Sequence, residues 1–159
     1  MRTTAYLGLG ANLGDRAASL AEAARRIASD RVLVRRSSSA WETAPRGILD
    51  QPWFLNQVLE IDTDLSAVEL FRHIQGIELE MGRVRGERNG PRLIDIDILL
   101  FGDQQVSAPD LEIPHPRMAE RRFVLEPLAE LAPGLRHPVT GKTTREMLVE
   151  VGDQAARAV

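Results

Sequence analysis

One nine-residue segment, residues 93–101, constrains the possible folds of this chain more than any other part. Its sequence LIDIDILLF is rich in aliphatic and β-branched side chains, and a Gly-Asp pair follows it directly. Such a run closed by turn residues is typical of a buried β-strand. Because side chains alternate between the two faces of a strand, Asp95, Asp97 and Leu99 face one way, and the isoleucines and Leu100 face the other. The sequence therefore predicts a strand with two carboxylates on one face.

The segment before this strand, residues 83–92, is a glycine-containing loop with arginine at positions 83, 85, 88 and 92. The arginine side chain presents a planar fork of donors that matches phosphate oxygens. Magnesium is usually held by one or two carboxylates together with substrate phosphates. Loop and strand together therefore predict a site for a metal-bound phosphate. The simpler alternative is a strand edge with two solvated aspartates beside a solvated basic loop.

Composition restricts the class of protein. A chain of 159 residues is expected to form one domain, residues 1–159, around a single core. The net charge of -3 argues against general nucleic-acid binding, which needs an excess of Lys and Arg. The absence of cysteine excludes disulfides and Cys-based zinc sites. No apolar run reaches the length of a membrane span and no signal pattern opens the chain, so we expect a cytoplasmic protein without membrane contact. We also expect a monomer.

The hydrophobic pattern alternates between strand and helix along the chain. Extended segments are predicted at residues 5–9, 31–43, 53–62 and 93–101. Helices are predicted from an Asp15 N-cap through residue 29, and from a Ser66–Glu69 capping box to about residue 82. Short helical pieces follow at 126–131 and 144–149. This order predicts an α+β fold, a ferredoxin-like βαββαβ sandwich with αβα layers and a C-terminal helical and loop appendage.

Two glycine motifs resemble phosphate-binding sequences but do not match them. Gly8, Gly10 and Gly14 would form a dinucleotide fingerprint only if position 13 were glycine, so a turn is the simpler interpretation. Residues 141–143, Gly-Lys-Thr, would end a P-loop only if position 136 were glycine, where the chain has arginine. A P-loop kinase is therefore not expected.

Five segments together resemble the 6-hydroxymethyl-7,8-dihydropterin pyrophosphokinase family of folate synthesis. They are GLGANLGDR near the start, ETAPRG, WFLNQV, IELEMGRVRGERNGPRLIDIDILLFGD and IPHPRMAERRFVLEPLAELAP. The likeness runs from residue 6 to residue 133. The resemblance implies transfer of pyrophosphate from ATP to the hydroxymethyl group of 6-hydroxymethyl-7,8-dihydropterin, giving AMP and the pterin diphosphate for tetrahydrofolate synthesis.

The resemblance also assigns roles to individual residues. Asp95 and Asp97 would bind two Mg²⁺ ions, and Arg83 and Arg92 would contact the phosphates and stabilise charge during transfer. The positions that match the family's ATP site are Gln75, Glu78, Arg85, Arg88, Ile98, His115, Arg117 and Arg121. The positions that match its pterin site are Thr43, Ala44, Pro45, Arg46, Phe54, Asn56 and Phe123.

These roles agree with the chemistry of the side chains. A pterin is a flat ring with a donor and acceptor edge, which Phe54, Phe123 and Asn56 suit. Phe54 and Asn56 share a strand face, and Gln75 and Glu78, three apart on a helix, are expected to project together. Transfer at phosphorus depends on positioning and charge neutralisation, and no side chain is assigned as a general base.

Two other functional classes stay open at this point. A non-catalytic ferredoxin-like module could bind an anionic metabolite through the arginine loop without turning it over. A metal-dependent phosphohydrolase could use Asp95 and Asp97 to release phosphate without any pterin. Formation of AMP, with and without the pterin, separates the three.

Overall fold

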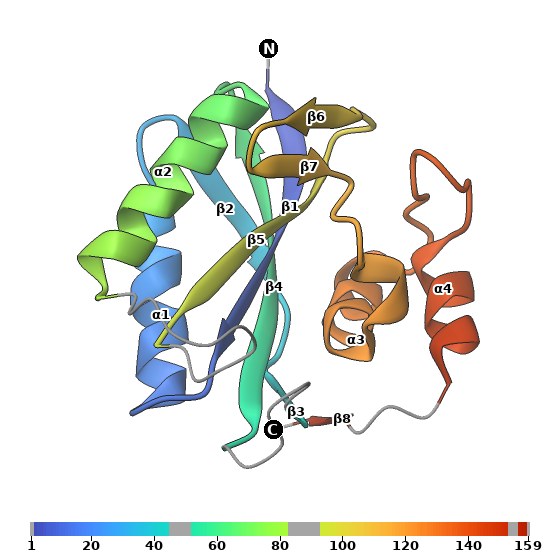
Figure 1. Ribbon diagram of the computed structural model, residues 1–159, viewed down its shortest axis with the longest axis horizontal. Coiled ribbons are helices and arrows are strands. Elements are labelled where there is room, and N and C mark those ends of the chain that lie inside the picture. Colours follow the sequence, from blue (N-terminus) through green and yellow to red (C-terminus); the bar gives the residue numbers. More distant parts are fainter. Residues whose placement is uncertain (1, 45–51, 83–92, 153–155, 159) are drawn as a thin grey trace.

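The computed structural model describes residues 2–44, 52–82, 93–152 and 156–158. A six-stranded sheet forms its centre (Figure 1). The strands are β1 (Thr3–Ala11), β2 (Val32–Ser37), β3 (Trp41–Thr43), β4 (Phe54–Thr63), β5 (Asp95–Phe101) and β8 (Ala156–Ala158). Their order is β5-β1-β4-β3-β8, and β2 also pairs with β4. All of the pairings are antiparallel.

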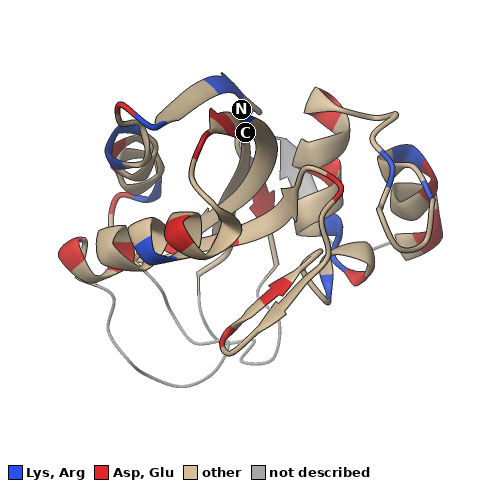
Figure 2. Ribbon diagram, turned by 90° about the horizontal axis from the view of Figure 1, so that it is seen from above, with Lys and Arg blue, Asp and Glu red and all other residues tan. Residues whose placement is uncertain are grey.

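Helices cover both faces of the sheet. On one face lie α1 (Arg16–Ile27) and α2 (Ala67–Glu80), and on the other lie α3 (Arg122–Leu131) and α4 (Thr144–Val151), preceded by the short 3-10 helix η1 (Met118–Glu120) (Figure 1). A separate hydrophobic core fills each interface. Figure 2 shows Lys and Arg interspersed with Asp and Glu over both layers. The antiparallel sheet with helices on both faces confirms the ferredoxin-like αβα sandwich predicted from the sequence. No helix in the described ranges has the length and apolarity to cross a bilayer.

The helix starts are explained by their first residues. The Asp15 carboxylate accepts a hydrogen bond from the Ala18 amide, and Ser66 and Glu69 form a reciprocal capping box. These bonds satisfy amides that have no partner inside the helix. Both predicted caps are therefore confirmed.

The prediction of a turn at Gly8, Gly10 and Gly14 was wrong for the first two glycines, whereas Gly14 lies in the bend after β1 with a φ of 62°. Gly8 and Gly10 lie inside β1, a central strand paired with β4 on one side and β5 on the other. A turn would require the chain to leave the sheet, whereas pairing on both sides keeps it extended. Glycine inside a strand often marks a place where a ligand or another group approaches the backbone closely.

The side-chain alternation of β5 breaks near its end. The register with β1 shifts there, so that Ile98 opposes Leu7 but Leu100 opposes Tyr6. As a result Leu99 and Leu100 both pack in the core under α3 and α4, and the prediction that Leu100 shares a face with the isoleucines was wrong. A β-bulge places one extra residue in a strand, which strict period-two reasoning cannot anticipate.

Two features were not predicted. A hairpin of β6 (Val106–Ala108) and β7 (Leu111–Ile113) follows β5, and β8 adds to the sheet beside β3. All three strands have only three residues, too few for a periodic pattern to be visible. The hairpin matters for the site, because the chain runs from the end of β7 through Pro114 to His115.

Candidate active site

Two rows of residues cross the sheet on the face that carries α3. Gly10 pairs with Asn56 on β4 and with Asp95 on β5. Gly8 pairs in the same way with Val58 and Asp97. Because directly opposed residues of a sheet share a face, each glycine separates a β4 side chain from a β5 carboxylate. Between Asn56 and Asp95 the sheet therefore carries no side chain of its own at Gly10, whereas the side chain of Leu99 covers Gly8.

The space over Gly10 is bounded by the side chains of β4. A Cβ atom at Gly10 would lie 3.0 Å from Asn56 Oδ1 and 3.7 Å from Phe54 Cδ1. Phe54 and Asn56 therefore both project to the face of Gly10, as their spacing predicted. The atoms nearest to a Cβ at Gly8 belong to the side chain of Leu99, the first at 3.3 Å.

The Asn56 amide is oriented by its neighbour on β3. Its Nδ2 donates a hydrogen bond to Thr43 Oγ1, and both residues are buried. With the nitrogen bound to Thr43, Oδ1 is the amide atom on the side of Gly10. Ala44 directly follows β3, while Pro45 and Arg46 lie outside the described residues. Thr43 and Asn56 thus form a polar corner next to Phe54.

The two aspartates stand at the start of β5. Asp95 is its first residue, and Asp97 has a side chain that is 39% exposed. His115 Nε2 lies 3.8 Å from Asp97 Oδ2. Ile98, another residue of the predicted ATP site, points to the opposite face and packs in the core beneath α1 and α2.

His115 is held in one tautomer by the backbone. Its Nδ1 accepts a hydrogen bond from the Arg117 amide at 3.2 Å, and its own amide donates to the Leu99 carbonyl at 3.0 Å. Since Nδ1 is an acceptor, the neutral ring carries its proton on Nε2, the nitrogen that faces Asp97. Burial, followed by the positive charge of Arg121, lowers the His115 pKa to about 4. The ring is therefore neutral at pH 7.

This lowered pKa makes a contribution to stability that depends on pH. The unfolded chain takes up a proton at His115 near pH 6.5, but the folded chain does so only near pH 4, so stability falls as the pH decreases through that window. Between pH 7 and pH 5 we expect the free energy of unfolding to fall by about 1 to 2 kcal/mol more in the wild type than in His115→Gln. Urea unfolding at both pH values measures this. Equal losses would contradict the buried, neutral imidazole.

The start of α3 brings an aromatic ring and a cation to the same face. The Arg121 guanidinium lies over the Phe123 ring, 5.3 Å from its centroid. Phe123 packs against the core under α3 and α4. The far end of the helix is anchored to the sheet, since Glu130 accepts a hydrogen bond from the Ser39 amide and Arg36 donates to the Leu131 carbonyl. These bonds fix the position from which Phe123 projects.

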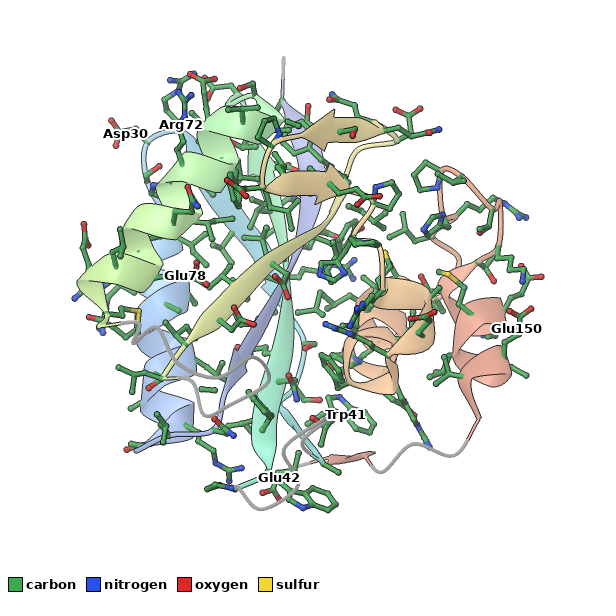
Figure 3. The ribbon with its side chains drawn as sticks, viewed as in Figure 1. Asp30, Trp41, Glu42, Arg72, Glu78 and Glu150 are labelled. Carbon is green, nitrogen blue, oxygen red and sulfur yellow. The ribbon has the colours of Figure 1, made fainter. Side chains whose placement is uncertain are left out.

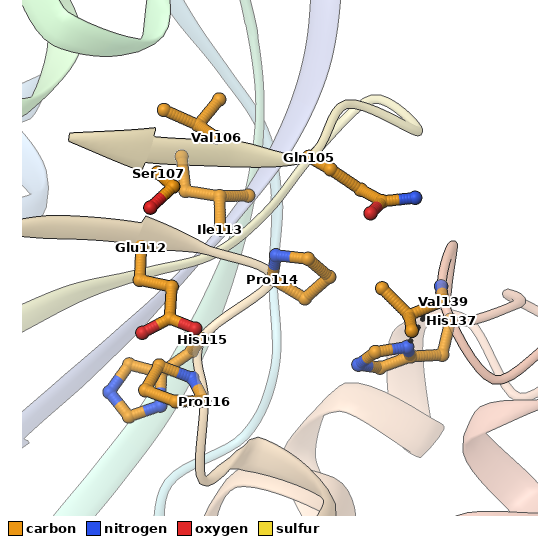
Figure 4. Close-up of a pocket in the computed structure, with 10 residues that line it drawn as sticks. All are labelled: Gln105, Val106, Ser107, Glu112, Ile113, Pro114, His115, Pro116, His137 and Val139. Atoms are coloured by element: carbon orange, nitrogen blue, oxygen red, sulfur yellow. Dashed lines mark hydrogen bonds between the residues drawn. The ribbon is translucent and has the colours of Figure 1, made fainter.

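A groove adjoins His115. Its volume is about 300 Å³, and the hairpin β6–β7 forms one wall through Val106, Ser107 and Glu112. His137 and Val139 stand opposite, as Figure 4 shows. His115 lines the groove and also approaches Asp97, so it joins the groove to the carboxylates.

Not all of the predicted site residues converge. Gln75 is exposed on α2, whereas Glu78 is buried against β5, so the two residues expected to project together differ in their surroundings. The reason is their position relative to the buried stripe of α2: at about 100° per residue, Glu78 lies about 40° from Ile74 and Gln75 about 100° from it. Arg117 is exposed beside His115. The arginines Arg83, Arg85, Arg88 and Arg92 lie outside the described residues.

The donor set fits magnesium only in combination with other oxygen ligands. In the parts of the chain that the structure describes, no three His, Asp or Glu side chains gather closely enough to hold a metal by themselves. Asp95 and Asp97 supply hard carboxylate oxygens on one face of β5. Magnesium commonly completes its coordination with water and substrate phosphates, so two carboxylates suffice.

The absence of β1 side chains at Gly8 and Gly10 is the site feature that the sequence interpretation missed. Its signal was present, because two glycines two residues apart in an apolar strand leave one face of that strand without side chains. What the pattern could not show was that both glycines oppose β5 as well as β4. That pairing places Gly10 between Asn56 and Asp95, and Gly8 between Val58 and Asp97.

Comparison with known proteins identifies the family of the chain. The family model of 7,8-dihydro-6-hydroxymethylpterin-pyrophosphokinase (HPPK) matches residues 6–133. A 2-amino-4-hydroxy-6-hydroxymethyldihydropteridine pyrophosphokinase of Methylorubrum extorquens is 47% identical over 152 residues, covering 94% of each chain. The protein of the same name in Bacillus subtilis is 43% identical over 155 residues, covering 97% of this chain and 93% of its own.

Solved structures show the same fold. The crystal structure of Plasmodium falciparum HPPK-DHPS with pteroate superposes with a TM-score of 0.76 at 18% identity. The match covers 94% of this chain but 42% of that one, so this chain spans less than half of the solved protein. By the family model and the identity to these relatives, the chain belongs to the 7,8-dihydro-6-hydroxymethylpterin-pyrophosphokinase family.

Proposed function

We propose that this protein transfers pyrophosphate from ATP to the hydroxymethyl group of 6-hydroxymethyl-7,8-dihydropterin, a step of tetrahydrofolate biosynthesis. The hydroxymethyl oxygen forms a bond to the β-phosphorus, and the bond from that phosphorus to the α,β-bridging oxygen breaks. The products are AMP, the pterin diphosphate and the proton of the hydroxyl group. The row Asn56–Gly10–Asp95 carries the proposal, because it sets a polar, aromatic-lined corner beside a carboxylate pair with no side chain between them.

The pterin would lie over Gly10 between Phe54 and Phe123. Its donor and acceptor edge would face the Asn56 amide, whose orientation Thr43 sets. Ala44, Pro45 and Arg46 would complete this side of the site. Aromatic faces with a few oriented polar groups are the usual means of holding a flat heterocycle.

The phosphates would lie over the start of β5. Asp95 and Asp97 would hold two Mg²⁺ ions, which neutralise phosphate charge when bound. The neutral His115 adds no positive charge that would compete for the carboxylates, and its Nε2 proton is available to a phosphate oxygen. Arg83 and Arg92 would stabilise charge during transfer, with Arg85 and Arg88 on the nucleotide. The groove beside His115 would take the adenosine part of ATP.

The same proposal covers where the protein acts and whether it is a monomer. ATP and a reduced pterin are small soluble substrates, which suits an enzyme that acts in the cytoplasm. All of the groups invoked above come from one chain, which suits a monomer. A sedimentation measurement at assay concentration checks the second point.

The decisive experiment measures AMP formation under three conditions: ATP alone, ATP with 6-hydroxymethyl-7,8-dihydropterin, and ATP with 6-methyl-7,8-dihydropterin, which lacks the accepting oxygen. We expect AMP to form only with the hydroxymethyl compound, one AMP for each pterin diphosphate. AMP or phosphate release without pterin would favour the hydrolase. Binding of ATP without turnover under all three conditions would favour the non-catalytic module that only binds an anionic metabolite.

The bare sheet at Gly10 leads to a separate prediction. In Gly10→Ala the new Cβ would press on Asn56 Oδ1, so we expect the KM for the pterin to rise about tenfold while ATP affinity is unchanged. Gly8→Ala is the comparison variant on the same strand, because its Cβ would press on the buried Leu99 side chain and not on Asn56. Steady-state kinetics with each substrate varied in turn measures both. A KM for the pterin that rises equally in the two variants would contradict the placement of the ring over Gly10.

A further inference from the structure

Glu78 is a carboxylate buried where α2 packs against the edge of the sheet. Its side chain is 4% exposed, and its Oε2 accepts a hydrogen bond from the Ile96 amide at 2.9 Å. Figure 3 places it between α2 and β5. A buried carboxylate costs free energy that an aliphatic side chain at the same point would not. Its presence therefore calls for a role that an apolar residue cannot fill.

The amide that Glu78 binds lies between the two aspartates. Ile96 separates Asp95 from Asp97, and its side chain packs in the core under α1 and α2 while theirs face the other way. β5 is the last strand on its side of the sheet, and Leu9 of β1 opposes Ile96. An amide on the open side of an edge strand has no strand partner. Glu78 supplies the partner at that position.

The bond to Glu78 acts on the backbone that carries both aspartates. The peptide unit joining Asp95 to Ile96 is planar and rigid, so its rotation would tilt the Asp95 side chain and shift the strand toward Asp97. Asp95 begins β5, and strand ends fray when pairing on one side is all that holds them. Magnesium tolerates little deviation from octahedral geometry, so its ligands must be held closely.

We propose that Glu78 is a positioning residue: it fixes β5 through the Ile96 amide and thereby sets the separation and direction of the Asp95 and Asp97 carboxylates. The sequence resemblance placed Glu78 in the ATP site. The structure assigns it a second task, which it performs through the backbone. The kinetic part of this inference rests on the proposed function, while the structural part does not.

Three variants separate positioning from a direct action of the Glu78 charge. Glu78→Gln keeps a side-chain oxygen that can accept from the Ile96 amide, but removes the charge. Glu78→Met has a similar length and no comparable acceptor. Glu80→Gln is the matched control on the same helix, where the side chain is 66% exposed and pairs with Arg26.

The first measurement is hydrogen exchange of the Ile96 amide, followed by NMR in the metal-free protein. We expect the amide to exchange at least tenfold faster in Glu78→Met than in the wild type, and within about threefold of the wild type in Glu78→Gln and Glu80→Gln. Amides of β4, such as that of Leu59, report whether the sheet as a whole stays folded. Unchanged exchange at Ile96 in Glu78→Met would overturn the proposal.

The second measurement is the Mg²⁺ concentration that gives half-maximal AMP formation. We expect it to rise about tenfold in Glu78→Met with an unchanged KM for the pterin, and to be nearly restored in Glu78→Gln. If the half-maximal Mg²⁺ concentration rises as far in Glu78→Gln as in Glu78→Met, the charge acts directly on the ligands and the proposal is wrong. If the wild type forms no AMP at all, the proposed function fails, and the exchange result still decides the structural part.

Discussion

Replacing Asp97 by Asn is expected to lower AMP formation at least about a thousandfold while the protein stays folded. The substitution keeps the shape of the side chain but removes the charge that attracts a magnesium ion. Asp97 is 39% exposed and lies outside both cores, so its contribution to packing is small. We therefore expect the free energy of unfolding to change by no more than about 0.5 kcal/mol. A coupled assay for AMP and a urea titration measure the two quantities.

The control for this prediction is Asp103→Asn. Asp103 is exposed in the turn that follows β5, so the variant has the same chemical change on the same segment without access to the site. It should keep wild-type turnover. Near-normal AMP release from Asp97→Asn at low Mg²⁺ concentration would refute the role of Asp97 as a metal ligand. Loss of turnover together with loss of folding would indicate a structural residue.

The second large effect is expected for Asn56→Ala, which should lower kcat/KM for the pterin about a hundredfold. The variant removes both hydrogen-bonding groups of the amide from a buried corner, and it leaves Thr43 Oγ1 without its donor. A site that is built to hydrogen-bond its substrate loses affinity when a polar group is left unpaired. Isothermal titration with a nonhydrolysable ATP analogue should give the wild-type affinity, because Asn56 lies across Gly10 from the aspartates.

Thr43→Val tests the orientation of this amide separately. The valine has nearly the same shape but cannot accept from Asn56 Nδ2, so the amide can rotate. We expect a loss of about tenfold in kcat/KM for the pterin, smaller than that of Asn56→Ala. Equal losses of pterin and ATP affinity in both variants would show that Asn56 does not belong to a pterin wall.

Local chemistry made much of the fold predictable. Asp15 and the Ser66–Glu69 pair determine where two helices begin, since a cap is satisfied within four residues of chain. The run at 93–101 and its two aspartates could be assigned to a strand because period two is also a local property. The extended segments before α2 were likewise found, although β2 and β3 turned out to be separate strands.

Two of the misses concern contacts between distant segments. The bulge that turns Leu100 to the α3 side arises from the register of β5 against β1, and the isolated sequence of β5 carries no mark of it. The burial of Glu78 depends on how α2 lies against β5. Spacing places Glu78 near Gln75 on the helix, but it does not tell that the Glu78 carboxylate meets the Ile96 amide of β5.

The residue types of the site were set by the sequence itself: two carboxylates two residues apart, an Asn beside a Phe, and a pair of glycines in an apolar strand. Their arrangement was decided by the tertiary structure. Antiparallel pairing of β1 with both β4 and β5 brings Asn56, Gly10 and Asp95 into one row, although Gly10 and Asp95 are far apart in the chain. The physical reason is that hydrogen bonding between strands, and the packing of helices on them, are cooperative over the whole domain, whereas sequence patterns report only on neighbours along the chain.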